Sequence, residues 1–145
     1  MTTIETAPAP PIRPAQIMLV EDNHGDIILL REMLKSLKLA NDLSVASDGA
    51  QALRMLRREE PYTDQPRPDL VLLDLNLPCI DGHEVLETVK KDPELCDLPV
   101  IVLSGSEALR DIEERIGVKA DGYAVKPIDL DTLKKIVGSI AHFGL

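Results

Sequence analysis

Residues 70–82 read Leu-Val-Leu-Leu-Asp-Leu-Asn-Leu-Pro-Cys-Ile-Asp-Gly, and this stretch gives the strongest indication of the fold. Its first four residues are apolar without interruption, which is typical of a strand buried on both faces of a parallel sheet. Asp74 ends this run. Further on, Asp81 can cap a helix and Gly82 permits a tight turn, and apolar residues at helical spacing follow over 85–89. The stretch therefore predicts a buried strand with an acid at its carboxyl end, a loop and a helix.

Four further segments repeat this unit of a short apolar run followed by helix-spaced apolar residues. The runs are residues 17–20, 43–46, 100–103 and 123–125, and the helical stretches begin near Ile27, Leu53, Leu109 and Leu130. Strands that alternate with helices imply a parallel sheet with helices on both faces. The sequence therefore predicts an α/β fold, a three-layer (βα)5 sandwich around a five-stranded parallel sheet.

Two segments fall outside these units. Residues 1–15 hold four prolines and little apolar content, so we expect a disordered, Pro-rich tail followed by one domain over 16–145. The connection over 61–68 is long for its position and contains three prolines. We expect it to be an exposed excursion at the end of the sheet away from the strand carboxyl ends.

Composition limits the possible functions. The 145 residues suit one domain, and the net charge of −9 argues against binding to nucleic acid, which depends on clustered Lys and Arg. No apolar stretch is long enough to cross a membrane and no signal peptide is evident, so we expect a cytoplasmic protein. The two cysteines, Cys79 and Cys96, match no metal or redox spacing and are expected to be ordinary reduced thiols.

Polar residues stand where four of the five apolar runs end. In chain order they are Glu21 with Asp22, then Asp74, Ser104 and Lys126. Ligands of open parallel sheets bind beyond the carboxyl ends of the strands, so these side chains are expected to converge at one edge. A strand-end acid taken alone is usually a helix cap, and a lone Ser or Lys there is usually a solvated loop residue. Helix capping and solvated loops do not explain why an acid pair, an acid, a hydroxyl and a lysine follow one another at four strand ends.

Three acids at one edge require a compensating cation, because like charges repel and one lysine is insufficient. An all-oxygen site favours Mg²⁺ or Mn²⁺ and argues against zinc, which prefers His or Cys. We expect Asp22 and Asp74 to bind the metal directly and Glu21 to bind it through water. The backbone carbonyl of Asn76 is a further candidate ligand.

The same residues suit phosphoryl transfer, which needs an in-line nucleophile and cations around the phosphoryl oxygens. Asp74 is the candidate nucleophile because a carboxylate can form an acyl phosphate. Lys126 would neutralise one phosphoryl oxygen and Ser104 would hydrogen-bond another. Water would hydrolyse the product in time.

Two other functions compete with this interpretation. A phosphatase with an aspartyl nucleophile would also need Mg²⁺ and a lysine, but it usually carries the nucleophile on its first strand with a second acid two residues later. Here the acid is on the third strand and Asn76 follows at that spacing. A flavodoxin-like cofactor carrier would need a Gly- or Ser/Thr-rich phosphate cradle after the first strand, and this sequence has none there. The chain also offers only two Tyr, one Phe and no Trp to stack on a flavin.

The chain resembles the receiver domain of two-component response regulators over about residues 16–140. The resemblance is carried by Leu-Val-Glu-Asp-Asn at 19–23, by the stretch 72–82, by Leu-Ser-Gly at 103–105 and by Tyr-Ala-Val-Lys-Pro at 123–127. It implies a flavodoxin-like fold with strand order 2-1-3-4-5 and a cis Lys126–Pro127 bond. The roles it implies are a metal-binding acid pair at Glu21 and Asp22, a phosphoacceptor at Asp74, a switch hydroxyl at Ser104, a rotating aromatic at Tyr123 and a phosphate-binding lysine at Lys126.

The resemblance also implies partners. A sensor histidine kinase would donate the phosphoryl group, and the chain looks most like the small single-domain receivers that serve phytochromes. Because the sequence stops at Leu145, we expect output through protein contact or a downstream phosphotransfer protein rather than an enzymatic activity. Near the site, Asp26 is expected to be a first-turn helix acid and His24 a solvated loop residue.

The last helix carries a wide apolar stripe. Its members are Leu130, Leu133, Ile136, Val137 and Ile140, with Ala141, Phe143 and Leu145 beyond. This is more apolar surface than one buried face requires, so a homodimer is expected through this end or through the face formed by the fourth helix, fifth strand and fifth helix.

Overall fold

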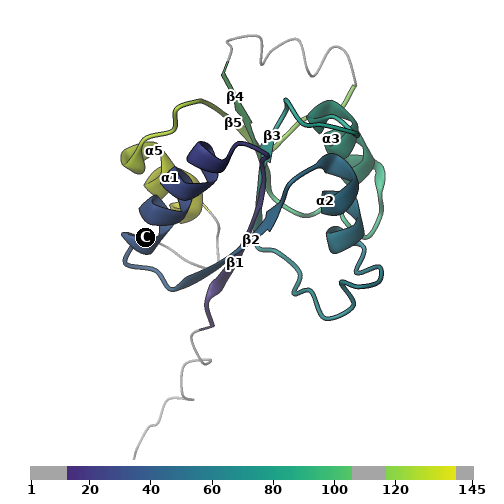
Figure 1. Ribbon diagram of the computed structural model, residues 1–145, viewed down its shortest axis with the longest axis horizontal. Helices are drawn as coiled ribbons and strands as arrows, with labels where there is room; N and C mark the ends of the chain where they lie inside the picture. Colours follow the sequence, from purple (N-terminus) through teal and green to yellow (C-terminus); the bar gives the residue numbers. More distant parts are fainter. Residues whose placement is uncertain (1–12, 106–116, 140–145) are drawn as a thin grey trace, which may run out of the picture.

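The computed structural model describes residues 13–105 and 117–139. Its centre is one sheet of five parallel strands in the order β2-β1-β3-β4-β5 (Figure 1). The strands are β1 (Ala15–Val20), β2 (Asn41–Ala46), β3 (Leu70–Asp74), β4 (Val100–Ser104) and β5 (Gly122–Val125). The predicted parallel sheet and its strand order are confirmed.

Helices cover both faces of the sheet. α1 and α5 lie on one face, and α2 and α3 lie on the other (Figure 1). Their bounds are α1 (His24–Lys35), α2 (Gly49–Leu56), α3 (Gly82–Lys91) and α5 (Leu130–Gly138). The three-layer sandwich is confirmed, and the helix predicted after β4 lies outside the described residues.

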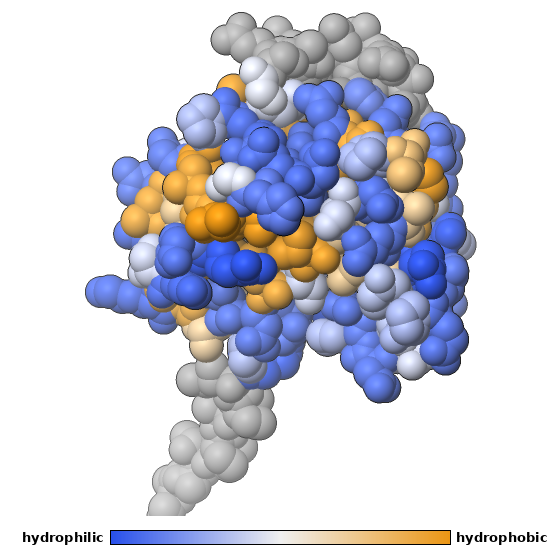
Figure 2. All heavy atoms as spheres, in the orientation of Figure 1, coloured by the Kyte–Doolittle hydropathy of each residue, from blue (hydrophilic) through white to orange (hydrophobic). Residues whose placement is uncertain are grey.

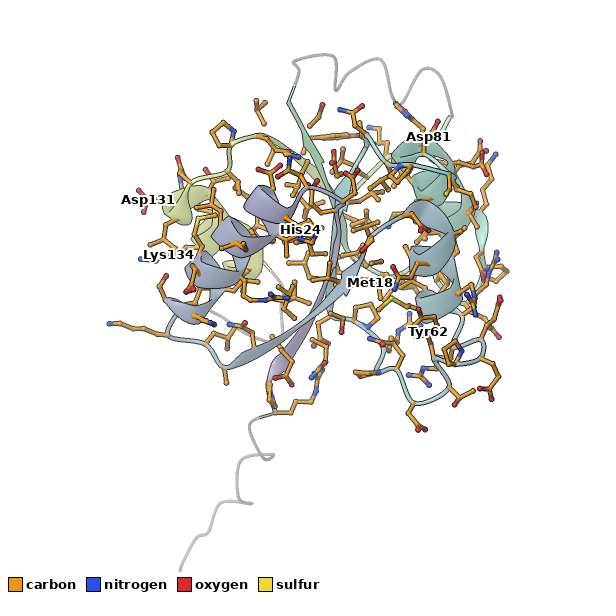
Figure 3. All side chains as sticks on the ribbon, in the orientation of Figure 1. Met18, His24, Tyr62, Asp81, Asp131 and Lys134 are labelled. Carbon is orange, nitrogen blue, oxygen red and sulfur yellow. The ribbon has the colours of Figure 1, made fainter. Side chains whose placement is uncertain are left out.

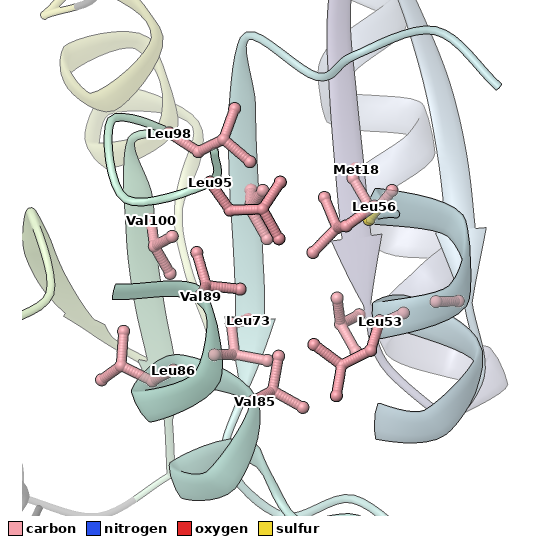
Figure 4. Close-up of a cluster of buried hydrophobic side chains, with 14 of the residues drawn as sticks. Met18, Leu53, Leu56, Leu73, Val85, Leu86, Val89, Leu95, Leu98 and Val100 are labelled. Carbon is pink, nitrogen blue, oxygen red and sulfur yellow. The ribbon is translucent and has the colours of Figure 1, made fainter. Parts of the chain in front are cut away.

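The core is divided by the sheet because successive strand residues point to opposite faces. On β1, Ile17 and Leu19 pack with α1 and α5, whereas Met18 and Val20 pack with α2 and α3. Figure 4 shows the cluster on the α2 and α3 face, in which leucines and valines of these helices pack against the strands. β3 is the middle strand of the sheet and is buried along its whole length.

Each helix in the described ranges begins with an Asn or Asp cap. The side chain of each cap accepts a backbone N–H from three residues later, which satisfies a donor that the helix leaves unpaired. The caps are Asn23, Asp48, Asp81 and Asp129. The predicted cap at Asp81 is therefore confirmed.

The sheet begins earlier than the sequence suggests. Ala15, which we assigned to the tail, is the fully buried first residue of β1. Before it, both terminal guanidinium nitrogens of Arg13 lie 2.8 Å from the carboxylate of Asp69, which also accepts the Gln16 N–H. Arg13 is thus held to the residue preceding β3, so the folded part of the chain includes residues before the expected boundary at residue 16.

The connection over 61–68 lies at the end of the molecule away from the strand carboxyl ends, as expected (Figure 3). It is not a simple exposed excursion. The ring of Tyr62 packs against the core beside α2, with Arg54 over its face at 5.6 Å, and its hydroxyl lies 3.1 Å from Gln51 Nε2. An aromatic anchor therefore fixes the connection to α2.

Two further expectations can be compared with the structure. The Lys126–Pro127 peptide bond is cis, as the resemblance implied. Among the helices of the described ranges, none has the length and apolar character that crossing a membrane requires.

Candidate functional site

The strand register brings the predicted residues to one edge of the sheet. Val20 pairs with Leu73, and Asp74 pairs with Leu103, so the carboxyl ends of β1, β3 and β4 lie level. Carboxylate oxygens of Glu21, Asp22 and Asp74 all come within 4.8 Å of one another. The convergence that the strand ends predicted is present in the structure.

Lys126 follows β5 and reaches across this acid cluster. Its Nζ lies 2.9 Å from Glu21 Oε2, 2.9 Å from Asp26 Oδ2 and 3.4 Å from Asp74 Oδ2. Burial opposes its charge, but hydrogen bonds to Glu21 and Asp26 outweigh that effect and raise the pKa of Lys126 above its ordinary value. The lysine is therefore a fixed positive charge beside Asp74.

Glu21 is the most enclosed acid of the cluster, with only 1% of its surface exposed. One carboxylate oxygen accepts the Asn23 N–H at 3.1 Å and the other accepts from Lys126. Burial nevertheless raises the pKa of Glu21, because the loss of hydration outweighs the nearby ammonium, and neighbouring Asp74 acts in the same direction. A cation bound beside it would offset this cost.

Asp74 ends the central strand and is 3% exposed. Its Oδ1 accepts the Asn76 N–H at 3.1 Å, while Oδ2 faces Lys126. The backbone of Gly82 packs so closely on the Asp74 carbonyl that a side chain there would overlap it. The position of Asp74 is thus held by the strand, the following loop and the start of α3.

Ser104 lies on β4, which pairs with β3, and Tyr123 lies on β5, the edge strand beyond β4. Ser104 is the buried last residue of β4 and pairs with Val125, directly before Lys126. Tyr123 pairs with Val102, lies half-buried and packs against the core on the α2 and α3 side. Its hydroxyl accepts the Ala120 N–H at 3.3 Å. Their switch roles stay predictions.

Asp26 has a contact that the sequence did not reveal. It lies in the first turn of α1, as predicted, but its carboxylate also pairs with Lys126. The two residues are a hundred positions apart, and a helical acid gives no strand-end signal. His24, which Figure 3 labels at the start of α1, is exposed and is the first helical residue rather than a loop residue.

The donor set fits a hard divalent cation. Glu21, Asp22 and Asp74 offer oxygen atoms from two neighbouring strand ends, and Asp22 is exposed to solvent, which leaves access for water and an anion. Both cysteines are free, and Cys79 is exposed in the loop after β3. With Lys126 beside Asp74, this arrangement can hold an anionic group against a carboxylate nucleophile.

Comparison with known proteins agrees with this arrangement. The sequence model of the protein family described as the response regulator receiver domain matches residues 17–138. Response regulator Rcp1 of Synechocystis sp. is 39% identical over 132 residues, which cover 91% of this chain and 90% of that protein.

Solved structures are similar over the same region. The phosphorylated cyanobacterial phytochrome response regulator RcpA is 41% identical with a TM-score of 0.76, and the match covers 90% of this chain and 93% of that one. The Mn²⁺-bound form of Rcp1 is 38% identical with a TM-score of 0.75, covering 86% and 91%.

Proposed function

The chain belongs to the response regulator receiver domain family, whose members accept a phosphoryl group from histidine kinases in two-component signalling, and we propose that Asp74 is its phosphoacceptor. The observation that carries the proposal is the contact between Asp74 and Lys126. A buried carboxylate at the end of the central strand has one oxygen facing a fixed ammonium at 3.4 Å. A cation beside the carboxylate offsets its repulsion from an anionic phosphoryl donor, which supports a nucleophilic role for Asp74.

In the proposed step, an Asp74 carboxylate oxygen attacks phosphorus and forms a P–O bond. The P–N bond to the phosphohistidine of the kinase breaks, and the imidazole leaves with the bonding electron pair. Lys126 and Ser104 receive phosphoryl oxygens, the first through its charge and the second through its hydroxyl. Later attack by water returns the carboxylate and releases inorganic phosphate, so the chemistry of the chain is limited to its own phosphoryl group.

The proposed cofactor is Mg²⁺ or Mn²⁺, held by Asp22 and Asp74 directly, by Glu21 through water and by the Asn76 carbonyl. The fit rests on three acids whose oxygens approach within 4.8 Å, and on the Mn²⁺ of the similar Rcp1 structure. A divalent ion bound there would offset the negative charge of the acids and of the incoming phosphoryl group.

Intact mass measurement tests the proposal. The wild-type chain incubated with Mg²⁺ and acetyl phosphate should gain one phosphoryl group, and Asp74→Asn should gain none. Asp131→Asn, an exposed acid in the first turn of α5, is the matched control and should react as the wild type does. Equal labelling of Asp74→Asn would contradict the proposal. Steady turnover of a phosphate ester without labelled protein would favour the phosphatase alternative.

We further propose a phytochrome-type histidine kinase as the donor and the cytoplasm as the location. The similarity to Rcp1 and to the phytochrome response regulator RcpA supports this choice. On α1, whose first turn carries Asp26, the side chains of Ile28 and Leu29 are 58% and 46% exposed. Figure 2 shows an apolar area over and beside α1 within a largely hydrophilic face. Exposed apolar residues beside a reactive centre suit a docking partner.

The proposed output is a change of surface at β5 and α5, read by a second copy or by a downstream phosphotransfer protein. Leu130 and Ile136 of α5 are half-buried at the edge of the core, which leaves apolar surface for such a contact. Leu133 and Val137 of the predicted stripe are buried in the core, and Ile140, Ala141, Phe143 and Leu145 lie outside the described ranges. Sedimentation with and without beryllofluoride, a phosphoryl analogue, tests the phosphorylation-dependent dimer. We expect the mass to rise when the analogue is added, and an unchanged monomer mass would contradict the dimer.

A further inference from the structure

Asp26 is placed beside the site by the way α1 begins. The cap Asn23 accepts the Asp26 N–H at 3.0 Å, which fixes Asp26 as the third helical residue. An acid at this position often turns back to bind the cap N–H. Here Glu21 already accepts that N–H at 3.1 Å. The Asp26 carboxylate is therefore available for Lys126, which it meets at 2.9 Å.

The ammonium of Lys126 has three N–H donors and faces three carboxylates. The contacts with Glu21 and Asp26 are short, at 2.9 Å each, whereas the contact with Asp74 is 3.4 Å. The two short contacts come from the residue after β1 and from the first turn of α1, so they hold the ammonium from two separate places in the fold. The third, longest contact is the one that a phosphoryl oxygen on Asp74 can replace.

We propose that Asp26 is a positioning residue, which together with Glu21 holds Lys126 so that its third donor points at the phosphoryl group on Asp74. The inference rests on the proposed phosphoacceptor role of Asp74. Asp26 does not touch the phosphoryl group in this arrangement and acts only through the lysine. A long, flexible side chain held by one carboxylate instead of two would spend less time in the productive orientation.

The opposite role predicts the opposite effect. If Asp26 competed with the phosphoryl group for Lys126, removing its carboxylate would free the ammonium and accelerate the reaction. The side chain of Asp26 is 40% exposed, so solvent weakens its pull on the lysine. The phosphoryl group carries more charge and displaces the longer contact, which favours positioning over competition.

The experiment compares the wild type with Asp26→Ala and Asp26→Asn at saturating acetyl phosphate and Mg²⁺. We expect Asp26→Ala to lower the rate constant of phosphorylation about three- to tenfold. Asp26→Asn keeps an acceptor for Lys126 without the charge and should fall between the two. Glu32→Ala, an exposed acid on the same helix, is the matched control and should equal the wild type.

Two further readouts separate positioning from other roles. Affinity for Mg²⁺, followed by thermal shift, should be the same in Asp26→Ala and Glu32→Ala, because Asp26 is not in the acid cluster. A faster Asp26→Ala, or one equal to the wild type, overturns the inference while leaving Asp74 as acceptor. A wild type that takes up no phosphoryl group overturns the proposed function itself.

Discussion

Glu21 and Lys126 form an enclosed ion pair that joins the end of the first strand to the end of the last, with Oε2 2.9 Å from Nζ. Only 2% of the Glu21 side chain and 20% of the Lys126 side chain are exposed. Charges so enclosed lose hydration and depend on each other. Removing one partner of this pair should therefore lower the free energy of unfolding as well as change the chemistry of the site.

The first prediction concerns this dependence. Lys126→Met leaves Glu21 beside Asp74 without its ammonium, and breaking an enclosed pair at one side should lower the free energy of unfolding by about 2 kcal/mol in the absence of metal. Urea denaturation with a chelator present measures it. Adding Glu21→Gln to Lys126→Met should recover part of the loss, because the enclosed Glu21 is then neutral while Asp74 and Asp26 still lack their ammonium.

Lys35→Met is the matched control for this experiment. Lys35 pairs with Glu32 on the surface of α1, with both side chains about two-thirds exposed. Removing such a pair should change the free energy of unfolding by about 0.5 kcal/mol or less. An equal loss in both lysine variants would show that enclosure of the Glu21 pair is not what stabilises the fold.

The second prediction concerns the metal. Mg²⁺ at about 100 times its dissociation constant should raise the free energy of unfolding by about 2.7 kcal/mol, because it binds only the folded acid cluster. Asp22→Asn removes a proposed direct ligand and should abolish most of the effect. Asp131→Asn should retain it. Thermal melts across a Mg²⁺ titration measure the effect, and an unchanged response of Asp22→Asn would exclude this residue as a ligand.

The third prediction concerns pH and the cap of α5. The N–H and the hydroxyl of Thr132 hydrogen-bond the Asp129 carboxylate and hold the pKa of Asp129 below its ordinary value. The unfolded chain therefore binds the proton first as pH falls. The stabilisation is complete above the ordinary carboxyl pKa and is lost as pH falls through the lowered one.

Asp129→Asn keeps the capping oxygen but cannot titrate. As pH falls from the ordinary carboxyl pKa through the lowered pKa of Asp129, the free energy of unfolding of the wild type should decrease relative to that of Asp129→Asn. At higher pH the difference between the two proteins should stay constant. Urea denaturation at a series of pH values checks this. A difference that does not change with pH would exclude Asp129 as the titrating group.

The sequence predicted those parts of the site that follow strands. A buried strand is a continuous apolar run, so its last residue is visible, and parallel strands place these ends at one edge. Glu21, Asp22, Asp74 and Lys126 were found by that rule alone. The rule is independent of distance along the chain, which explains why residues from the first and last strands were correctly brought together.

The sequence failed where position depends on side-chain reach. Asp26 meets Lys126 because Glu21 occupies the cap N–H of α1, and no local pattern reports that exchange. Arg13 meets Asp69 in a segment whose prolines suggested disorder. Tyr62 anchors a Pro-containing connection by packing on α2. Such tertiary contacts are made by single long side chains, which periodicity does not detect.

The fourth prediction separates kinase docking from chemistry. Ile28→Ser on α1 replaces an exposed apolar side chain beside the site, so it should leave phosphorylation by acetyl phosphate unchanged. Transfer from a phosphorylated phytochrome-type histidine kinase should slow about tenfold, because truncating a docking residue removes contact with the partner. Lys91→Ser, which is exposed on α3 at the other face of the sheet, is the control and should not slow transfer. Equal slowing with both donors would contradict the docking role.

The fifth prediction concerns the contact of Gly82 with the backbone of Asp74. A Cβ at position 82 would overlap the Asp74 carbonyl and the Leu75 backbone, neither of which can rotate away as a side chain does. Gly82→Ala should therefore displace α3 from the end of β3 and lower the free energy of unfolding by about 2 kcal/mol. Because Asp74 ends β3, phosphorylation should slow as well. Gly105→Ala has open space around its Cβ and should unfold as the wild type does, so equal losses in the two variants would rule out the close contact as the cause.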